Sequence, residues 1–293
     1  MNFRLSRLIA AAPLLVAGTL SMAAPSFAAE PVEDALKAWV AAIDASPSFT
    51  ATYGTLTVVG GTAVMSGLTV RSEGSADVEI TADTLTIAGY RPGTGGGFSA
   101  DDISVGSIRA RLGQSNTTLT SLHMRSLAMP DYSTATFDPD QPFSSIMKFY
   151  KIFLTTNLAE LTVADITTVQ SIGSQTSNVS YRNLSMTGFA NGNVAALNAG
   201  PLQMSSPSPD GLLRFTIDKI ESYDTNLGTF VHVFDPAEYN GGVGDMQWLP
   251  AMRLGAYRNL VAEAPGARVM LHDLEMTDLR MRQPPAPFTA FLD

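Results

Sequence analysis

Cysteine is absent from this chain of 293 residues, and histidine and tryptophan are scarce, with three and two copies. Without cysteine the protein forms no disulfide, has no thiolate nucleophile and offers no thiolate ligand to a metal ion. Its stability must therefore come from packing and hydrogen bonds rather than from cross-links. This composition is compatible with export, but it gives an exported chain none of the covalent staples that small secreted domains use.

Motifs that carry catalytic chemistry are also missing. The three histidines, His123, His232 and His272, each lie in a run that is typical of a strand, and none has a second ligand at zinc-site spacing. There is no G-x-S-x-G nucleophile elbow. The neighbours Asp101 and Asp102 do not supply two carboxyl groups facing each other across a cleft, as glycosidases require. The sequence predicts no catalytic residue, no metal site and no cofactor.

Positive charge is in short supply. Only 15% of residues are charged, and the chain has 18 Lys+Arg against 27 Asp+Glu. Arg4 and Arg7 lie within residues 1–28, so the remainder carries 16 basic against 27 acidic residues. An acidic surface repels nucleic-acid phosphates, and the basic residues are scattered rather than clustered. We therefore expect no nucleic-acid binding.

Residues 1–28 are typical of a bacterial secretory signal. Arg4 and Arg7 form the basic segment, an apolar segment runs from Leu8 to about Leu20, and Ser26-Phe27-Ala28 places small residues before a cleavage site at Ala29. An uncleaved N-terminal anchor is the alternative. No later segment is long and apolar enough for a transmembrane helix. We expect a periplasmic or secreted protein that is not an integral membrane protein.

One apolar pattern recurs along most of the chain. Leu161, Val163 and Ile166 follow Φ-x-Φ-x-x-Φ, where Φ is a large apolar residue. Two apolar residues two apart share one face of a strand, and a third placed three further on breaks that parity. The strand must therefore bulge, bend or turn a corner at the x-x step if all three residues reach one core. The same spacing occurs at Leu85/Ile87/Tyr90, Ile103/Val105/Ile108, Leu122/Met124/Leu127, Leu184/Met186/Phe189, Phe215/Ile217/Ile220 and Leu274/Met276/Leu279.

This pattern predicts a mainly β fold, a twisted, repetitive antiparallel sheet with a groove-like or sandwich-like shape. The early motifs start 17 to 19 residues apart, which indicates a repeat of two short strands plus turns, and a β-solenoid is the alternative. Asn191-Gly192 favours a hairpin and hence the antiparallel sheet. An amphipathic helix is expected over 29–47, before a β domain over 48–293 that contains an inserted helix at about 142–158.

A longer internal duplication, of about 119–208 and 209–283, is also expected. It is indicated because Tyr181-Arg182-Asn183-Leu184 recurs as Tyr257-Arg258-Asn259-Leu260.

The bent-strand motif, the export signal and the interleaved helices resemble secreted bacterial β-repeat proteins. Over roughly residues 50 to 282 the chain is similar to the AsmA-like and lipopolysaccharide-bridge proteins of the bacterial envelope. The resemblance implies twisted sheets whose groove shields lipid tails. The inserted helix at 142–158 departs from the bridge proteins, and no functional residue is carried over from them.

Two functions follow as expectations. The first is a non-catalytic envelope protein, a scaffold or a binder of a hydrophobic or lipid ligand, with lipid or other envelope proteins as partners. Its ligand would contact the apolar residues Leu85, Ile87, Leu161, Val163, Leu184, Met186, Phe215 and Ile217. The alternative is an enzyme acting on envelope polysaccharide or peptidoglycan, with Asp165, Tyr181 and Arg182 as candidate residues.

Overall fold

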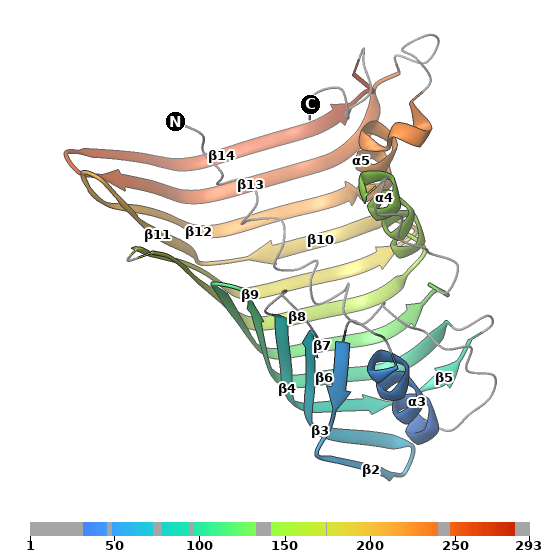
Figure 1. Cartoon of the computed structure of the whole chain (residues 1–293). Helices are drawn as coiled ribbons and strands as arrows, with labels where there is room; N and C mark the ends of the chain where they lie inside the picture. The colour runs from blue at the N-terminus through green and yellow to red at the C-terminus, as the bar shows by residue number, and fades with distance from the viewer. Residues whose placement is uncertain are drawn as a thin grey trace.

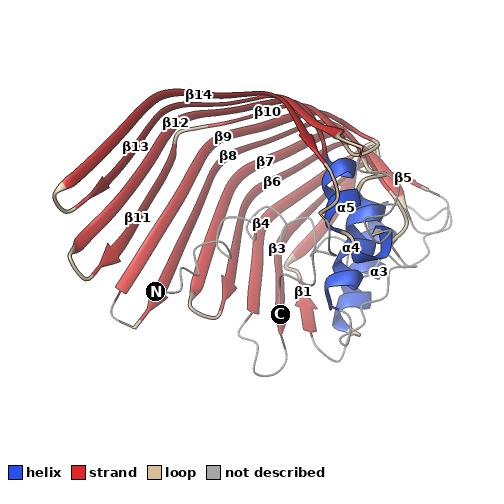
Figure 2. Ribbon diagram, turned by 90° about the horizontal axis from the view of Figure 1, so that it is seen from above, coloured by secondary structure: helices blue, strands red, loops and turns tan. Residues whose placement is uncertain are grey.

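The computed structural model describes residues 32–45, 49–72, 78–93, 97–132, 142–173, 175–239 and 247–284, with the side chains of 142–146 and 172 left out. The expected signal at 1–28 lies outside these residues. Within them the protein is one large antiparallel sheet, bent into an arch, with three α-helices on the inner side of the bend (Figures 1 and 2).

The sheet has 14 strands. Their spatial order is β1-β3-β4-β6-β7-β8-β9-β10-β12-β13-β14, and β2 and β5 pair with β3 and β6 outside this order. β11 continues the line of β10, because both lie between β9 and β12 in one unchanged register. The strands are β1 (Phe49–Thr52), β2 (Thr55–Val59), β3 (Thr62–Ser72), β4 (Val78–Ala88), β5 (Arg91–Pro92), β6 (Phe98–Leu112), β7 (Ser115–Met129), β8 (Asn157–Ile172), β9 (Gln175–Ala190), β10 (Asn193–Ala199), β11 (Leu202–Ser208), β12 (Gly211–Asn226), β13 (Leu249–Ala264) and β14 (Ala267–Met281).

The predicted fold class is therefore confirmed, and the solenoid alternative is wrong for the described strands. A solenoid stacks parallel strands, whereas the pairings here are antiparallel and join successive long strands through short turns. Asn191 and Gly192 form the predicted hairpin turn between β9 and β10, both with positive φ. The repeat unit differs from the prediction, because each repeat is one long bent strand and not two short ones.

The bends fall on a line that crosses the sheet. At one level of the sheet, β7, β9, β12 and β14 each hold one residue with positive φ, and Gly89, just after β4, lies at the same level. We call this set, with φ between 49° and 65°, kink line 1: Gly89, Ser126, Gly188, Asp224 and Asp278. The register is the same on both sides of the Ser126 and Gly188 kinks; for example, Ala100 pairs with Leu127 and Asp102 with Arg125. These two positions are therefore bends without an inserted residue, and not bulges. Beside Asp278, β13 and β14 shift register between Pro250 and Met252.

A second line of bends runs parallel to the first. Kink line 2 contains Gly67, Ser121, Asn183 and Asn259, with φ between 50° and 64°. The x-x steps of the apolar motif coincide with these lines: Arg125-Ser126 on kink line 1, and Ala164-Asp165 opposite Asn183 on kink line 2. The predicted bend at the x-x step is thus confirmed. At Gly89, Ser126, Gly188 and Asp278 a left-handed residue in the step returns the third apolar side chain to the same face, whereas in β6, β8 and β12 the step lies opposite a left-handed residue of a neighbouring strand.

Three α-helices and one short 3-10 helix complete the fold: α3 (Val32–Asp44), α4 (Pro142–Phe153), α5 (Leu227–Phe234) and η2 (Pro236–Glu238). α3 lies within the predicted 29–47 and packs against β1, β2 and β3. α4 ends at Phe153 rather than near 158, because Leu158 already lies in β8 as a buried strand residue. Phe153 stacks on Phe189 of β9, with ring centroids 5.0 Å apart, and so joins α4 to the sheet.

α5 is a helix where the sequence indicates a strand. His232 lies in α5 and not in a strand, so that interpretation is wrong, while His123 and His272 do lie in β7 and β14. The helix begins because the Asn226 side chain accepts a hydrogen bond from the Thr229 N–H, at 3.1 Å, and caps the first turn.

The repeated Tyr-Arg-Asn-Leu segments have a local explanation. Asn183 and Asn259 both adopt a left-handed conformation on kink line 2, with φ of 50° and 51°. Asn tolerates this conformation better than most residues, because its short side chain forms local hydrogen bonds. The two copies lie on β9 and β13, which run in opposite directions in the sheet. The likeness therefore reflects one type of bend, and the larger duplication stays a prediction.

Candidate functional site: the apolar inner face

The inner face of the sheet carries unbroken rows of apolar side chains. Cross-strand pairs in an antiparallel sheet share a face, so the registers can be followed from strand to strand. One such row, which we call the long row, crosses ten strands without a polar residue other than the tyrosine hydroxyl. Its members are Leu68, Ala82, Ile108, Leu119, Ile166, Tyr181, Leu202, Ile217, Leu260 and Leu271.

The neighbouring inner row is also largely apolar, interrupted only by Ser222 and Gly255. This second row, between the two kink lines, is Ala63, Ile87, Ile103, Met124, Leu161, Met186, Leu197, Ser222, Gly255 and Met276. In the described parts of β4 and β6–β14, no charged residue or histidine occupies an inner-face position; the polar side chains there are Ser, Thr, Gln and the Tyr hydroxyls. The described part of this face therefore offers no charged side chain to a ligand.

The outer face is polar, and it is held by cross-strand ion pairs. Arg125 contacts Glu160 at 2.9 Å between β7 and β8, and Arg258 of β13 contacts Asp273 at 3.0 Å and also Glu275 on β14. These pairs are largely exposed, so each contributes at most about 1 kcal/mol. The charged side chains of these pairs all lie on the outer face. The sheet therefore has one polar, charged face and one apolar face.

All eight residues predicted to contact a hydrophobic ligand lie on the inner face. Leu85, Val163 and Leu184 share one level of the sheet, Ile87, Leu161 and Met186 share the next, and Phe215 and Ile217 lie on β12. Burial divides them into two sets. Leu85, Ile87, Val163 and Ile217 are buried, whereas Leu161, Leu184, Met186 and Phe215 are half-buried.

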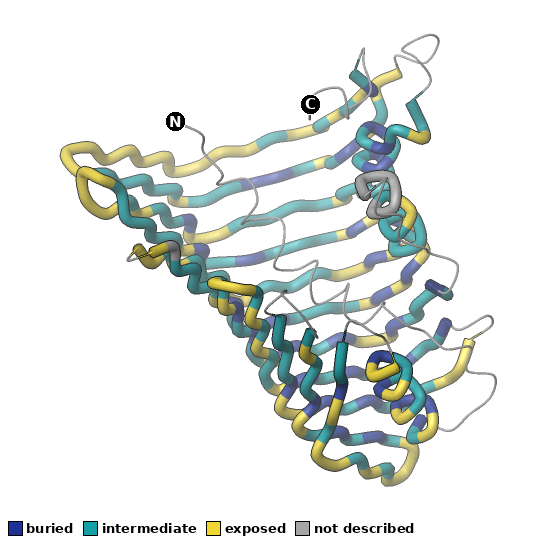
Figure 3. Tube along the Cα trace, viewed as in Figure 1, coloured by how far each residue is buried: buried dark blue, intermediate teal, exposed yellow. Residues whose placement is uncertain are grey.

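Exposure of the inner face rises toward β14. The main core cluster combines α3 with strands up to β10 and does not extend to β12–β14. Leu271, at the end of the long row, is 41% exposed, and Val269 beside it is 62% exposed. Figure 3 shows β14 exposed along most of its length. The apolar face thus continues past the packed core and ends at an accessible edge.

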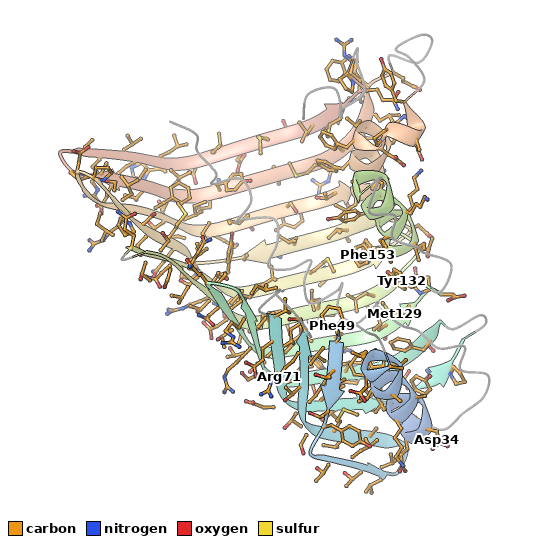
Figure 4. All side chains as sticks on the ribbon, viewed as in Figure 1. Asp34, Phe49, Arg71, Met129, Tyr132 and Phe153 are labelled. Atoms are coloured by element: carbon orange, nitrogen blue, oxygen red, sulfur yellow. The ribbon has the colours of Figure 1, made fainter. Side chains whose placement is uncertain are left out.

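The helices cover only one end of the strands. Figure 4 shows Met129, Tyr132 and Phe153 near this end, whereas Arg71 lies toward the opposite end. Burial raises the pKa of the Tyr132 hydroxyl and of Tyr150 on α4, in keeping with a packed helical end. The opposite halves of the strands have no described helix over their inner face.

A polar cluster joins the helices at that end. The Lys151 ammonium group donates to Asp235 at 2.6 Å and to Glu238 at 2.8 Å, and His232 Nδ1 lies 2.7 Å from Glu238. The Gln283 amide donates to the carbonyl oxygens of His232 and Glu238. Burial lowers the pKa of Lys151, but its two carboxylate partners outweigh burial and raise the pKa above its ordinary value. The cluster ties α4, α5 and the segment after β14 together.

The candidate residues of the alternative enzymatic function do not converge. Asp165 and Arg182 form an exposed ion pair at 3.4 Å on the outer face, whereas Tyr181 is on the inner face in the long row. Asp101 contacts Arg91, and Asp102 contacts His123 at 2.5 Å. An open pocket of about 560 Å³ between the tips of β12, β13 and β14 contains a single carboxylate, Glu263. Asp235 and Glu238 do come together, but both are ion partners of Lys151 in the helical cluster.

No family model, curated protein or solved structure matches this chain. In the described part of the sequence, none of the helices has the length and hydrophobicity needed to cross a bilayer. No group of three or more His, Asp or Glu side chains suited to a metal ion occurs among the same residues. The shape and the chemistry of the sheet are therefore the basis for the function proposed below.

Sequence reasoning found only half of the inner-face signal. The full pattern in β7 is Leu119, Leu122, Met124 and Leu127, all buried, which contains an x-x step on each side of the Φ-x-Φ pair. The first x-x step ends at Ser121 on kink line 2, and the second ends at Ser126 on kink line 1. The complete pattern with both steps also occurs in β8, β9 and β14.

Proposed function

We propose that the protein is a non-catalytic binder of lipid, which holds aliphatic chains along the apolar inner face of its bent sheet. The observation that carries the proposal is the long row, ten strands of apolar side chains that end at the exposed Leu271. An acidic, exported protein of the cell envelope would use such a face to keep lipid tails away from water. The expected location in the periplasm or outside the cell is part of this proposal.

The dimensions of the face suit a long apolar ligand. Neighbouring strands lie about 4.8 Å apart, so ten strands extend over roughly 43 Å. That length exceeds the hydrocarbon thickness of a bilayer, which is about 30 Å. Leu68, Ala82, Leu119 and Ile166 of the long row are already packed in the core, so an acyl chain would occupy the part of the face toward β14. Burial of each methylene group contributes about 0.8 kcal/mol, so chain length alone can supply the affinity.

The chemistry of the face favours tails over headgroups. In the described parts of β4 and β6–β14, inner positions carry no charge that could recognise a phosphate, whereas Arg125, Glu160, Arg258 and Asp273 lie on the outer face. Met124, Met186 and Met276 all lie in the second inner row, and methionine adapts its shape to irregular apolar partners. We therefore expect selectivity for aliphatic chains with little discrimination among headgroups.

The proposal is tested by lipid extraction and by titration with a fluorescent C18 fatty acid. The full chain, purified from bacterial envelopes without detergent, should release lipid on organic extraction, and after delipidation it should bind the fatty acid saturably. Phe215→Asp puts a carboxylate on the inner face and should weaken binding by at least about tenfold, or 1.4 kcal/mol.

Thr216→Asp is the matched control, because Thr216 follows Phe215 in β12 and points to the outer face. This variant should bind the fatty acid like the wild type. Circular dichroism and melting temperature report whether each variant is folded. Absence of extractable lipid, together with no saturable binding by a folded wild-type chain, contradicts the proposal and leaves a plain structural β protein.

A further inference from the structure

The edge formed by β14 is unlike the other edge of the sheet. Short strands finish the opposite edge, where β1 has four residues and β2 has five, and α3 packs against both. β14 has 15 residues, and among the described strands it pairs with β13 alone. A long, exposed strand with unpaired N–H and C=O groups is a template for another strand, and proteins usually shorten or cover such edges.

The apolar positions of β14 are symmetric about Glu275. Inner-face residues occur at Val269, Leu271, Leu274, Met276, Leu279 and Met281, with gaps of two, three, two, three and two residues. When an antiparallel copy is placed with Glu275 opposite Glu275, Leu274 faces Met276 and Leu271 faces Leu279. Val269 then faces Met281. Each of these six inner side chains of one copy therefore meets an inner side chain of the other, and only Ala267, at the start of β14, has no inner partner.

The bends and the outer charges fit the same register. Asp278 lies on kink line 1, and in this register it faces His272 of the second copy. Within each chain, His272 lies opposite Asn259 of kink line 2. The imidazole of His272 can donate to the Asp278 carboxylate of the second copy, and the symmetry makes this contact twice. The two Glu275 side chains meet at the centre, but each already has Arg258 of its own chain as an ion partner.

We propose that the protein forms a two-fold symmetric dimer by antiparallel pairing of β14 with β14 of a second copy, centred on Glu275. The two-fold axis is perpendicular to the sheet, so the inner faces of both copies lie on the same side and their apolar rows continue across the junction. Isologous contacts of this kind close on themselves and leave no further edge for growth. The inference does not depend on what the inner face binds.

The absence of cysteine permits a direct test by cross-linking. Glu275→Cys places one thiol on the two-fold axis, where opposed Cβ atoms lie about 5 Å apart, close enough to form a disulfide. In Thr277→Cys, on the same face of the same strand, the two thiols lie four residues apart, about 13 Å. At micromolar protein, pairing within a dimer gives a millimolar effective concentration, so Glu275→Cys should oxidise to a dimer about a hundredfold faster than Thr277→Cys.

Two further measurements complete the test. A mixture of Thr277→Cys and Asp273→Cys should form a heterodimer rapidly, because residue 277 faces residue 273 of the second copy. Wild-type protein should sediment as a dimer, and Thr277→Asp should shift it toward monomer, since that carboxylate would face Asp273. Equal cross-linking of Glu275→Cys and Thr277→Cys, or a wild type that sediments as a monomer at every concentration, would overturn the proposal.

Discussion

Lys151 of α4 and Asp235, at the end of α5, form an ion pair of 2.6 Å although 84 residues separate them in the chain. The Asp235 side chain is only 3% exposed, while that of Lys151 is 39% exposed. Asp235 also accepts a hydrogen bond from the Ala237 N–H, at 2.9 Å, and caps η2. A single carboxylate therefore joins two helices and starts a third, which makes the pair the main polar connection at the helical end.

Lys151→Met should destabilise the protein, because it leaves the buried Asp235 carboxylate without its cation. Breaking a fully buried pair costs about 3–5 kcal/mol, and the partial exposure of Lys151 reduces this to about 1–3 kcal/mol. Lys148→Met, at an exposed position on the same helix, is the control and should change the free energy of unfolding little. Urea denaturation of both variants measures the difference, and equal midpoints would contradict the assignment.

The Lys151 cluster also predicts a pH dependence. The hydrogen bond from Lys151, and then that from His232, lowers the pKa of Glu238 below its ordinary value of 4.5. A lowered folded-state pKa stabilises the fold above the ordinary pKa, and this stabilisation is lost as the pH falls through the folded value. Glu238→Gln should thus be less stable than wild type at neutral pH, with the gap narrowing below pH 4.5. A gap that is constant from neutral to acid pH would be inconsistent with this.

Gly188 on kink line 1 and Gly106, which lies opposite Ser121 of kink line 2, should respond oppositely to alanine. Gly188 has a φ of 65°, and a Cβ there would lie 2.8 Å from the Ala195 Cβ, so Gly188→Ala should cost at least about 1–2 kcal/mol. Gly106 lacks a left-handed φ, and a Cβ would meet nothing within 4 Å. Gly106→Ala should therefore stabilise by about 0.4–1 kcal/mol. Thermal unfolding of the pair distinguishes a bend that needs glycine from one that does not.

Phe189 is the aromatic contact that holds α4 on the sheet. It is 1% exposed and stacks on Phe153, so Phe189→Ala should cost about 3–5 kcal/mol. Phe189→Leu keeps apolar bulk without the ring and should lose less. Hydrogen exchange should show α4 amides deprotected before those of β8 in the alanine variant. Simultaneous loss of protection in α4 and β8 would mean that α4 is not docked through this residue.

The sequence contains the bends but not their alignment. A strand whose apolar parity changes must bend, and this could be deduced from Leu122, Met124 and Leu127 alone. Whether successive bends form one line depends on register, which follows from turns and from every other strand at once. The eight inner-face residues are predictable from the sequence, because the spacing of the apolar motif is the spacing that brings apolar side chains of a bent strand to one face.

Other features could not be deduced, for identifiable reasons. Leu227–Phe234 is rich in β-branched and aromatic residues, so its composition favours a strand, and only the Asn226 cap marks it as α5. The Lys151–Asp235 pair joins residues far apart in the chain and carries no local pattern. The free edge at β14 depends on the whole strand order, because Leu274, Met276 and Leu279 repeat the motif of the interior strands.

The most direct test of the lipid-binding account is to map where a photoactivatable C18 fatty acid attaches to the full chain. After irradiation and proteolysis, mass spectrometry should find adducts on inner-face residues such as Leu184, Phe215 and Leu271, with excess unlabelled fatty acid preventing them. Adducts confined to outer-face residues, or labelling that excess fatty acid does not reduce, would contradict the account.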